Sequence, residues 1–220
     1  EHGLRTGLFT SPHLSTVRER IQIDGEPISQ ADFIRLWQDV APIIHVVDAR
    51  SIEAGGPRLS FFEVLVVLAY AAFADAPVDV AVIEVGMGGV WDATNVADGQ
   101  VAVVAPVSMD HAQWLGDDLA GIAREKAGII KDGAAAVIAE QPDAVAPVLI
   151  QAVADRGARA LWEGDALEVV DRQPGVGGQL VTLRTQAATY EDVFVPLYGA
   201  HQAHNALLAL AAVEALMADG

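Results

Sequence analysis

The stretch from Val78 to Asn95 constrains the fold of this chain more than any other. It begins as an apolar run of strand length that carries Glu84 close to its end, and it continues into a turn that contains Gly86, Gly88 and Gly89. A continuous apolar run is typical of a buried strand in a parallel sheet, and clustered glycines indicate that the backbone turns tightly or approaches a neighbour closely. The stretch therefore predicts a buried strand that delivers a carboxylate to a loop at a binding site.

Strand-like and helix-like segments alternate over about 150 residues of the chain. We expect helices at 29–47, 60–74, 119–127, 143–155 and 201–218, and strands at 4–9, 19–23, 78–85, 101–106, 134–139 and 159–162. Pro42 predicts a bend in the first helix or its division into two shorter ones. The alternation predicts an α/β fold with a mainly parallel sheet flanked by helices. Short strand candidates between residues 166 and 197 predict a small antiparallel edge sheet.

The composition argues against several classes of site. The 220 residues include 13 basic and 30 acidic ones, a net charge of −17, which disfavours an extended face for nucleic acid or for an anionic membrane. Because there is no cysteine, disulfides, thiolate catalysis and cysteine-built zinc sites are excluded. No uncharged apolar run is long enough to span a membrane, and the N-terminus lacks the layout of a signal peptide. We therefore expect a cytoplasmic protein.

Polar residues follow three of the predicted strands. Ser11 and His13 come after the first, Glu84 closes the second, and Asp110 and His111 follow the third. Ligands of open α/β sheets bind beyond the carboxyl ends of the strands, so neighbouring strands would bring a hydroxyl, a carboxylate and an imidazole together. Such a set predicts a divalent metal site, in which the oxygen ligands favour Mg²⁺ and the imidazole leaves Mn²⁺ open.

Each of these residues also has a structural explanation. Glu84 can cap the turn that follows it, the Ser11 hydroxyl can form a turn, and His111 can be a structural histidine. An unpaired buried charge is costly, which favours a ligand role for Glu84, and the joint placement favours a site. The glycine turn does not fit dinucleotide binding, because Val90 and Trp91 follow it without the start of a helix. The P-loop pattern G-x-x-x-x-G-K-[ST] does not occur in the chain.

Two further segments carry candidate functional groups. Lys126 lies among small and apolar residues at a predicted helix end, where partial burial would make a reactive amine and where a lysine can also simply stabilise the helix C-terminus. Gln202 and Asn205 lie at the start of the last predicted helix, where amide side chains and free backbone N–H groups can meet an anion or a base edge.

Six motifs resemble those of folylpolyglutamate synthase, which with its sibling activity dihydrofolate synthase belongs to the ATP-dependent Mur ligase superfamily. They occur in the family's order and cover nearly the whole chain. The motifs are TSPHL (Thr10 to Leu14), RERIQIDGEPIS (Arg18 to Ser29), FFE (Phe61 to Glu63), EVGMGGVWDATN (Glu84 to Asn95), SMDHAQWLGDDLAGIAREKAGIIK (Ser108 to Lys131) and GAHQAHNALLAL (Gly199 to Leu210).

The resemblance implies a set of metal ligands. Ser11, Glu84 and His111 match the family's Mg²⁺ ligands. Lys126 matches a lysine that the family carbamylates, and a carbamate turns this cation into a carboxylate that can hold a second metal near the γ-phosphate of ATP. The implied cofactor is therefore Mg²⁺, as one ion or two, with Mn²⁺ as an alternative.

The resemblance also implies nucleotide and substrate contacts. Asn205 matches a position associated with the nucleotide, and Gln202 belongs to the same motif. Asp92, a catalytic candidate together with Lys126, lies where the family places its catalytic and pterin loops. The substrate-binding candidates in these loops are Thr10, Pro12, His13 and Thr94.

The implied reaction transfers a phosphoryl group from ATP to the terminal glutamate carboxylate of a folate, and the amine of an incoming L-glutamate then attacks the acyl phosphate. Three departures from the family stand out. The phosphate loop would lie upstream of Glu1, the C-terminal domain would lie beyond Gly220, and Val90 replaces a frequent arginine. We therefore expect residues 1–220 to be a partial central ATP-binding domain that is inactive alone, from a parent enzyme that is a monomer.

Two rival hypotheses remain. The first is a ligase of the same superfamily with another amino-acid acceptor. The second is a catalytically inert α/β module that binds a nucleotide, a folate or a protein partner.

Overall fold

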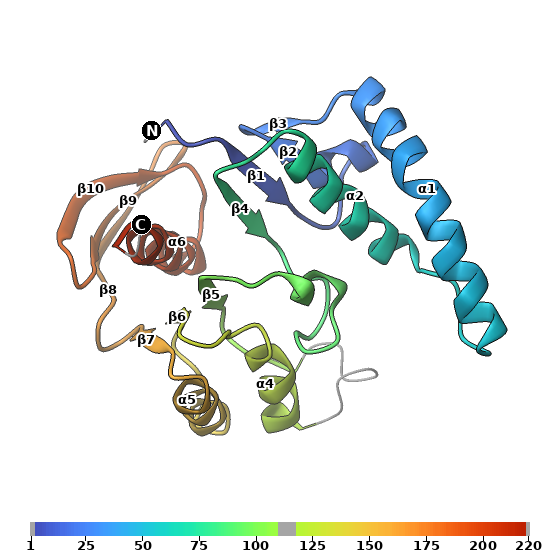
Figure 1. Ribbon diagram of the computed structural model, residues 1–220. Coiled ribbons are helices and arrows are strands. Elements are labelled where there is room, and N and C mark those ends of the chain that lie inside the picture. The colour runs from blue at the N-terminus through green and yellow to red at the C-terminus, as the bar shows by residue number, and fades with distance from the viewer. Residues whose placement is uncertain (1–2, 110–117, 219–220) are drawn as a thin grey trace. The chain divides into compact units, whose positions relative to one another are not determined.

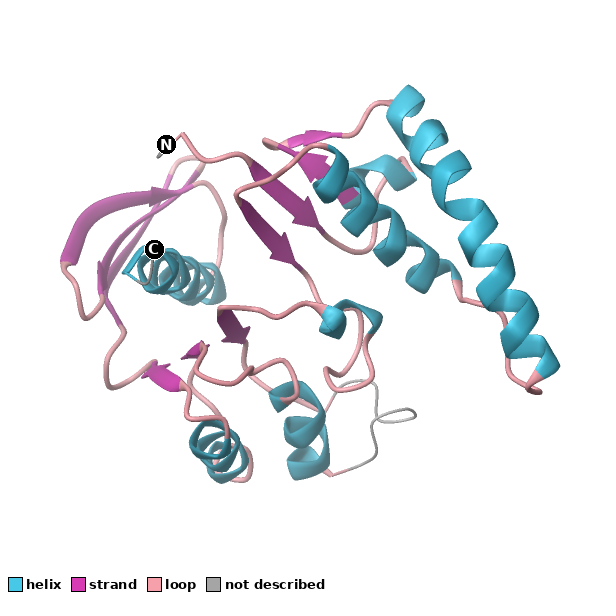
Figure 2. Ribbon diagram, viewed as in Figure 1, coloured by secondary structure: helices cyan, strands magenta, loops and turns pink. Residues whose placement is uncertain are grey.

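The computed structural model describes residues 3–109 and 118–218, and the chain divides into two compact units. The first unit contains the residues up to Met87 together with Asp92–Val96. The second contains Gly88–Trp91 and the residues from Ala97 onward. Figure 1 traces both along the chain, and Figure 2 shows that each combines helices with strands. The predicted α/β class is confirmed.

The first unit is built on a four-stranded sheet in the order β3-β2-β1-β4. Its strands are β1 (Thr6–Phe9), β2 (Ile21–Ile23), β3 (Glu26–Pro27) and β4 (Val80–Ile83). Its helices are α1 (Gln30–Glu53) and α2 (Phe61–Asp75), and its short 3-10 helices are η1 (Val17–Arg20) and η2 (Ala93–Val96). Strand β1 pairs antiparallel with β2 and parallel with β4. The buried side chains of Phe9, Ile21 and Leu65 hold the sheet against α2.

Both helices of this unit begin where the sequence predicts. The Ser29 hydroxyl accepts a hydrogen bond from the backbone N–H of Asp32, and Ser60 forms a reciprocal capping box with Glu63. Helix α1 is one helix of 24 residues, so the alternative of two shorter helices is wrong. Pro42 lies on its exposed side, where water can take the place of the hydrogen bond that the proline ring removes.

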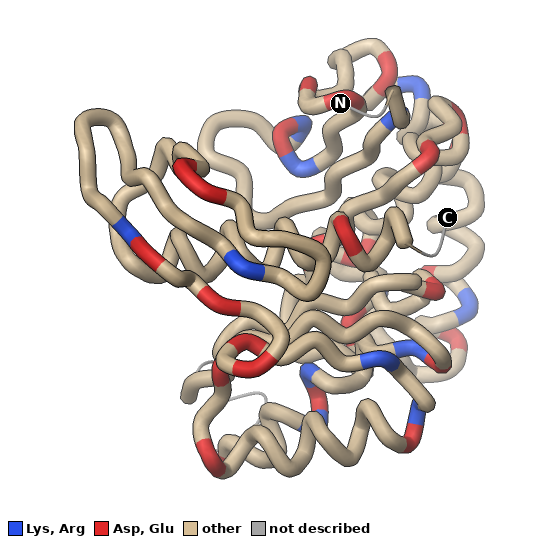
Figure 3. The backbone as a smooth tube through the Cα atoms, turned by 90° about the vertical axis from the view of Figure 1, so that its left-hand side faces the viewer, with Lys and Arg blue, Asp and Glu red and all other residues tan. Residues whose placement is uncertain are grey.

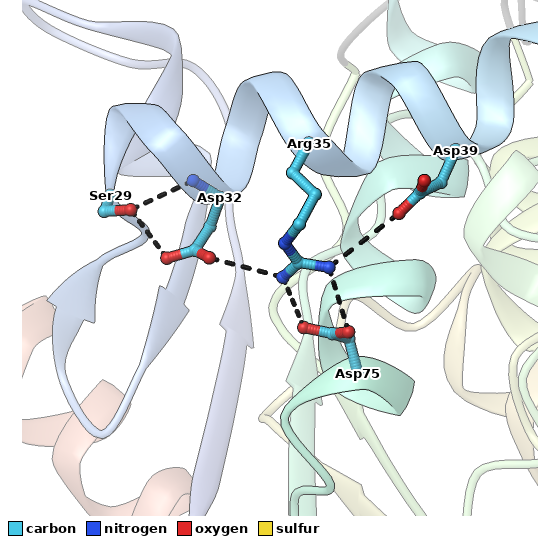
Figure 4. A network of polar contacts seen from close by, with 5 residues as sticks. All are labelled: Ser29, Asp32, Arg35, Asp39 and Asp75. Carbon is cyan, nitrogen blue, oxygen red and sulfur yellow. Dashed lines mark hydrogen bonds and ion pairs between the residues drawn. The ribbon is translucent and has the colours of Figure 1, made fainter.

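Arg35 joins the two helices of the first unit (Figure 4). Its guanidinium donates two hydrogen bonds to Asp75, of 2.6 and 3.1 Å, and one of 3.2 Å to Asp32. Asp39 lies 3.8 Å away on the next turn. The hydrogen bonds from Arg35 lower the pKa of Asp75, and those from Ser29 and then Arg35 lower the pKa of Asp32.

The second unit contains a parallel sheet in the order β5-β6-β7 and an antiparallel sheet in the order β10-β9-β8. Its strands are β5 (Val101–Val104), β6 (Ala135–Ile138), β7 (Arg159–Trp162), β8 (Glu168–Gly175), β9 (Gly178–Arg184) and β10 (Thr189–Val195). Its helices are α4 (Leu119–Ala127), α5 (Ala146–Asp155) and α6 (Ala200–Ala218). The predicted antiparallel sheet is confirmed, but its strands pair with one another and form a sheet of their own.

Strand β6 is the centre of the second unit, and all four of its residues are buried. Its side chains alternate between two cores, as a strand covered on both faces requires. Ala135 and Val137 belong to the core beneath α6 and the antiparallel sheet, whereas Ala136 and Ile138 belong to the core beneath α4 and α5. Within the described ranges, no helix is both long and apolar enough to cross a membrane.

Candidate functional site

The turn after β1 meets the end of β4. Phe9 lies opposite Ile83 in the parallel register, so the next residues of both strands leave the sheet side by side. The Thr10 hydroxyl donates to Oε2 of Glu84 at 2.5 Å, and the backbone N–H of Ser11 donates to the same oxygen at 2.6 Å. The structure therefore brings together two of the three predicted metal ligands, Ser11 and Glu84.

Glu84 differs from the prediction in its environment. Its side chain is exposed, and so are Ala81 and Val82 in β4, whereas the sequence predicted a buried strand. The carboxylate accepts hydrogen bonds from the turn after β1, whereas the structural explanation predicted contacts with the glycine turn that follows Glu84 in the chain. Both of these hydrogen bonds go to Oε2 of Glu84. The other carboxylate oxygen, Oε1, can therefore bind a ligand at the surface.

The loop that continues from Ser11 is held by charged side chains from η1. The Glu19 carboxylate accepts hydrogen bonds from the backbone N–H groups of residues 14 to 16, which lower its pKa. The Nε–H of Arg20 donates to Nδ1 of His13 at 2.9 Å, and the guanidinium lies 5.6 Å from the centre of the Phe61 ring. Pro12, the other substrate-binding candidate here, is exposed and follows a cis peptide bond.

Arg20 was not among the site residues predicted from the sequence. Its sequence signal is weak, because a charged residue beside a short alternating strand is usually solvated. Its position matters because the chain is strongly acidic, with acidic residues spread along the backbone (Figure 3). An anionic substrate must therefore be met by a few local cations or by a metal.

Asp92 shapes the loop that follows the glycine turn. One carboxylate oxygen accepts from the backbone N–H of Met87 at 2.8 Å, and the other accepts from the Thr94 backbone N–H at 2.9 Å and hydroxyl at 2.5 Å. Thr94 is buried, and its carbonyl accepts from the Tyr70 hydroxyl at 2.8 Å. Burial, and then the charge of Asp92, raise the pKa of Tyr70. Both candidates therefore form internal contacts of the loop.

The glycine turn packs against the end of α4. A Cβ atom on Gly89 would lie 2.2 Å from the carbonyl oxygen of Glu125, and the N–H of Val90 donates to this oxygen at 3.1 Å. Gly88 adopts a φ of 74°, in the left-handed region that favours glycine. The prediction that these glycines provide close packing is confirmed. The turn runs on to η2 and not into an α-helix, in agreement with the argument against dinucleotide binding.

Lys126 lies in the last turn of α4, next to the carbonyl that the glycine turn approaches. The helix is capped by Asp118, whose carboxylate accepts from the N–H groups of Ala120 and Gly121 at 3.1 Å each. Ile122 and Ala123 are buried and fix the helix on its core. Lys126 itself is half-buried, so the lysine can reach solvent from a fixed backbone position.

The two nucleotide candidates lie in the first turns of α6. The Nδ2 amide of Asn205 donates to Oε1 of Gln202 at 3.2 Å. Asn205 is exposed and Gln202 is half-buried. The pair leaves one amide oxygen and one amide nitrogen, on adjacent side chains, for a ligand.

His111, the third predicted metal ligand, lies outside the described residues, as does Asp110. The strand before it, β5, belongs to a different sheet from β1 and β4. Among residues 3–109 and 118–218, no group of three or more carboxylate, histidine or cysteine side chains is arranged to hold a metal. Ser11 and Glu84 supply oxygen donors of the kind that Mg²⁺ prefers, so they fit part of such a site.

Comparisons with known proteins find the same family throughout. A family model described as the Mur ligase middle domain matches residues 45–213. The dihydrofolate synthase/folylpolyglutamate synthase of Mycobacterium tuberculosis is 50% identical over 98% of this chain and 46% of its own length. The protein of the same name from Bacillus subtilis is 35% identical over 97% of this chain and 49% of its own length.

Solved structures agree with this result. A folylpolyglutamate synthase of Mycobacterium tuberculosis complexed with ADP and AMPPCP superimposes with a TM-score of 0.93 and 49% identity, over 98% of this chain and 49% of that one. A structure described as an FPGS-AMPPCP-folate complex superimposes with a TM-score of 0.89 and 35% identity, over 97% and 51%. The chain thus spans about half the length of each of these four relatives.

Proposed function

This chain belongs to the Mur ligase middle-domain family, and from that premise we propose that it is part of an ATP-dependent folylpolyglutamate synthase. The full-length protein would add L-glutamate to the γ-carboxylate of a tetrahydrofolate, with dihydrofolate synthesis as a second activity. Residues 1–220 would form part of its central ATP-binding domain. We further propose that the parent acts as a cytoplasmic monomer, with folate, L-glutamate and ATP as its partners.

One observation carries the proposal. Thr10, Ser11 and Glu84 meet at the carboxyl ends of two adjacent parallel strands, which is where α/β sheets bind their ligands. Relatives that match nearly the whole chain are named as synthases of this class, and solved relatives are described as complexes with ATP analogues and with folate.

The reaction would proceed in two balanced steps. A carboxylate oxygen of the folate attacks the γ-phosphorus of ATP, ADP leaves with the electrons of the broken P–O bond, and an acyl phosphate forms. The amine of L-glutamate then attacks the acyl carbon, phosphate leaves, and the nitrogen loses a proton. Because phosphoryl transfer depends mainly on positioning and electrostatics, the protein's task is to hold the two anions together.

Ser11, Glu84 and His111 are the residues that would hold Mg²⁺, which when bound offsets the charge of the phosphates. Carbamylated Lys126 would supply the carboxylate for a second ion, from the fixed last turn of α4. Thr10 keeps the Glu84 carboxylate oriented, and Asp92 keeps the following loop in shape. Arg20 and His13 would meet anionic groups of the substrate.

The nucleotide would meet Gln202 and Asn205. Their mutual hydrogen bond leaves the amide oxygen of Asn205 as an acceptor and the amide nitrogen of Gln202 as a donor. A donor beside an acceptor matches the amino group and adjacent ring nitrogen on the edge of an adenine base.

The test is a turnover assay of the full-length protein with ATP, L-glutamate and a reduced folate. Glu84→Ala and Lys126→Ala should each lower kcat at least about a hundredfold, because each removes a ligand of the Mg²⁺ that would offset charge in the transition state. Glu84→Gln keeps acceptors for Thr10 and Ser11 but loses the charge, so it should fold normally and still lose activity. Glu26→Ala, an exposed carboxylate on β3 of the same sheet, is the matched control.

Normal turnover by either alanine variant would contradict the site assignment. Elongation of a different acceptor, and not of folates, would instead support the rival Mur-type ligase. Nucleotide binding without turnover in the full-length protein would support the inert module.

A further inference from the structure

Gln179 in β9 is a polar side chain in the core of the second unit. It is 1% exposed, and both the oxygen and the nitrogen of its amide form hydrogen bonds. The amide nitrogen donates to the carbonyls of Leu197 and Gly199 at 3.0 Å each, and the amide oxygen accepts from Nη1 of Arg172 at 3.1 Å. Burial of an amide is unfavourable unless it is fully hydrogen-bonded, so these contacts are what a glutamine provides here that an apolar residue would not.

The two carbonyls that Gln179 binds lie immediately before α6. The carbonyl of Gly199 also accepts the backbone N–H of Gln202 at 3.1 Å, which closes the first turn of the helix. Gly199 has a φ of 99°, and a Cβ atom there would lie 2.6 Å from the His201 ring. Gln179 therefore holds the carbonyl oxygen from which α6 starts, at a backbone position that favours glycine.

A second side chain holds the same turn from the parallel sheet. Glu163 follows β7, and its side chain is only 7% exposed. One of its carboxylate oxygens contacts Nδ1 of His204 on α6, and the other accepts the backbone N–H of Glu140, beyond the end of β6, at 3.0 Å. The first turns of α6 are thus tied to both sheets of the second unit, to the antiparallel sheet by Gln179 and to the parallel sheet by Glu163.

We propose that Gln179 and Glu163 are positioning residues for the nucleotide site. They fix the first turns of α6 before the ligand arrives, so that the Gln202 and Asn205 amides already lie in the geometry that the base edge needs. Fixing a binding group in advance raises affinity, because less conformational freedom is lost on binding. This inference rests on the proposed function, since it assigns these amides to ATP.

The experiment measures the Kd of ADP by calorimetry and the KM of ATP, both with the full-length protein. Gln179→Met keeps the length of the side chain and removes the amide, and Glu163→Ala removes the contact with His204. Each should weaken ADP binding about tenfold and raise the KM of ATP, with the KM of L-glutamate unchanged. Glu163→Gln should restore most of the affinity, because an amide can still accept from Glu140 and donate to the imidazole.

Tyr190→Phe is the matched control. The Tyr190 hydroxyl donates to Glu214 on the same helix at 2.6 Å, about 18 Å along the helix axis from Gln202. The change should lower the melting temperature and leave the Kd of ADP unchanged. Should Gln179→Met fail to fold, the comparison of Glu163→Ala with Glu163→Gln carries the test.

The outcomes separate this inference from the proposed function. If Asn205→Ala weakens ADP binding while Gln179→Met and Glu163→Ala bind normally, the positioning role is overturned and the nucleotide site stands. An equal loss of affinity in Tyr190→Phe would show that the effect is one of general stability, which also overturns the inference. Normal ADP binding by Asn205→Ala would mean that the nucleotide site is wrong, and the inference would fall with it.

Discussion

Replacing Gly89 with alanine should impair the proposed synthase activity of the full-length protein, because there is no room for the added Cβ atom. The added Cβ would lie 2.2 Å from the carbonyl oxygen of Glu125 and 3.1 Å from the Cα of Lys126. Real Cβ contacts essentially never fall below 3.0 Å, so the turn and the end of α4 must separate by about 0.8 Å, from 2.2 to 3.0 Å. Both atoms belong to the backbone, and no rotation of a side chain can relieve the contact. Gly89 does not have a positive φ, so the effect is one of space alone.

Two magnitudes follow from this displacement. Overpacking of a close contact typically lowers the free energy of unfolding by about 1–3 kcal/mol. The displaced segment carries Lys126, which we propose as a catalytic residue, and a misplacement of about 1 Å in a catalytic group can lower the rate about a hundredfold. Gly89→Ala should therefore lower kcat far more than the loss of folded protein explains.

The assay pairs kcat with the melting temperature of the full-length protein. Gly99→Ala is the matched control, because its Cβ would lie no closer than 3.7 Å to its nearest neighbour, the carbonyl oxygen of Val101, and its φ is not positive. The control should show wild-type turnover and an unchanged or slightly raised melting temperature. A Gly89→Ala variant with wild-type kcat and melting temperature would refute the close packing of the turn on α4.

Two other predictions concern stability. Arg35 lowers the pKa of Asp75 and contributes to the lowered pKa of Asp32, so the stabilisation is fully present above the unfolded value of 3.8 and is lost as the pH falls through the folded values. Urea unfolding as a function of pH should show a steeper acid loss in the wild type than in Arg35→Met, and equal slopes would refute the link. Leu65→Ala, at a position that is 1% exposed in the core beneath α2, should lower the free energy of unfolding by about 2–5 kcal/mol, while Val67→Ala on the exposed side of the helix should change it by less than about 0.5 kcal/mol.

The elements that the sequence predicted best are those whose signals are local. The starts of α1 and α2 follow from Ser29 and Ser60, because a capping hydroxyl acts on backbone N–H groups only three residues away. Strand β6 could be recognised from its continuous apolar run. The end of α1 was predicted too early, because the apolar spacing that indicates a helix stops near Val47, whereas the helix continues to Glu53.

Relations between distant segments were predicted less completely. The pairing of Ser11 with Glu84 was foreseeable from the rule that ligands gather at the carboxyl ends of parallel strands. The exposure of Glu84 could not be predicted, because the sequence of an apolar strand does not show how much of each face of the sheet is covered by helices. The separation of the antiparallel strands into their own sheet likewise depends on which edges pair, and strand sequences of this length fit more than one partner.

Buried polar side chains mark the limit of what the sequence can reveal about this site. Gln179 and Glu163 belong to residue types that are mostly exposed, so the sequence offers no reason to place them inside. Their roles become visible only when the partners are known, because a carbonyl before a helix and an N–H beyond a strand have no sequence signature. The catalytic and nucleotide candidates could be recognised from their motifs because they lie on loops and helix starts with distinctive neighbours. The side chains that hold those motifs in place lie on ordinary strands, and only the packing of α6 against two sheets identifies them.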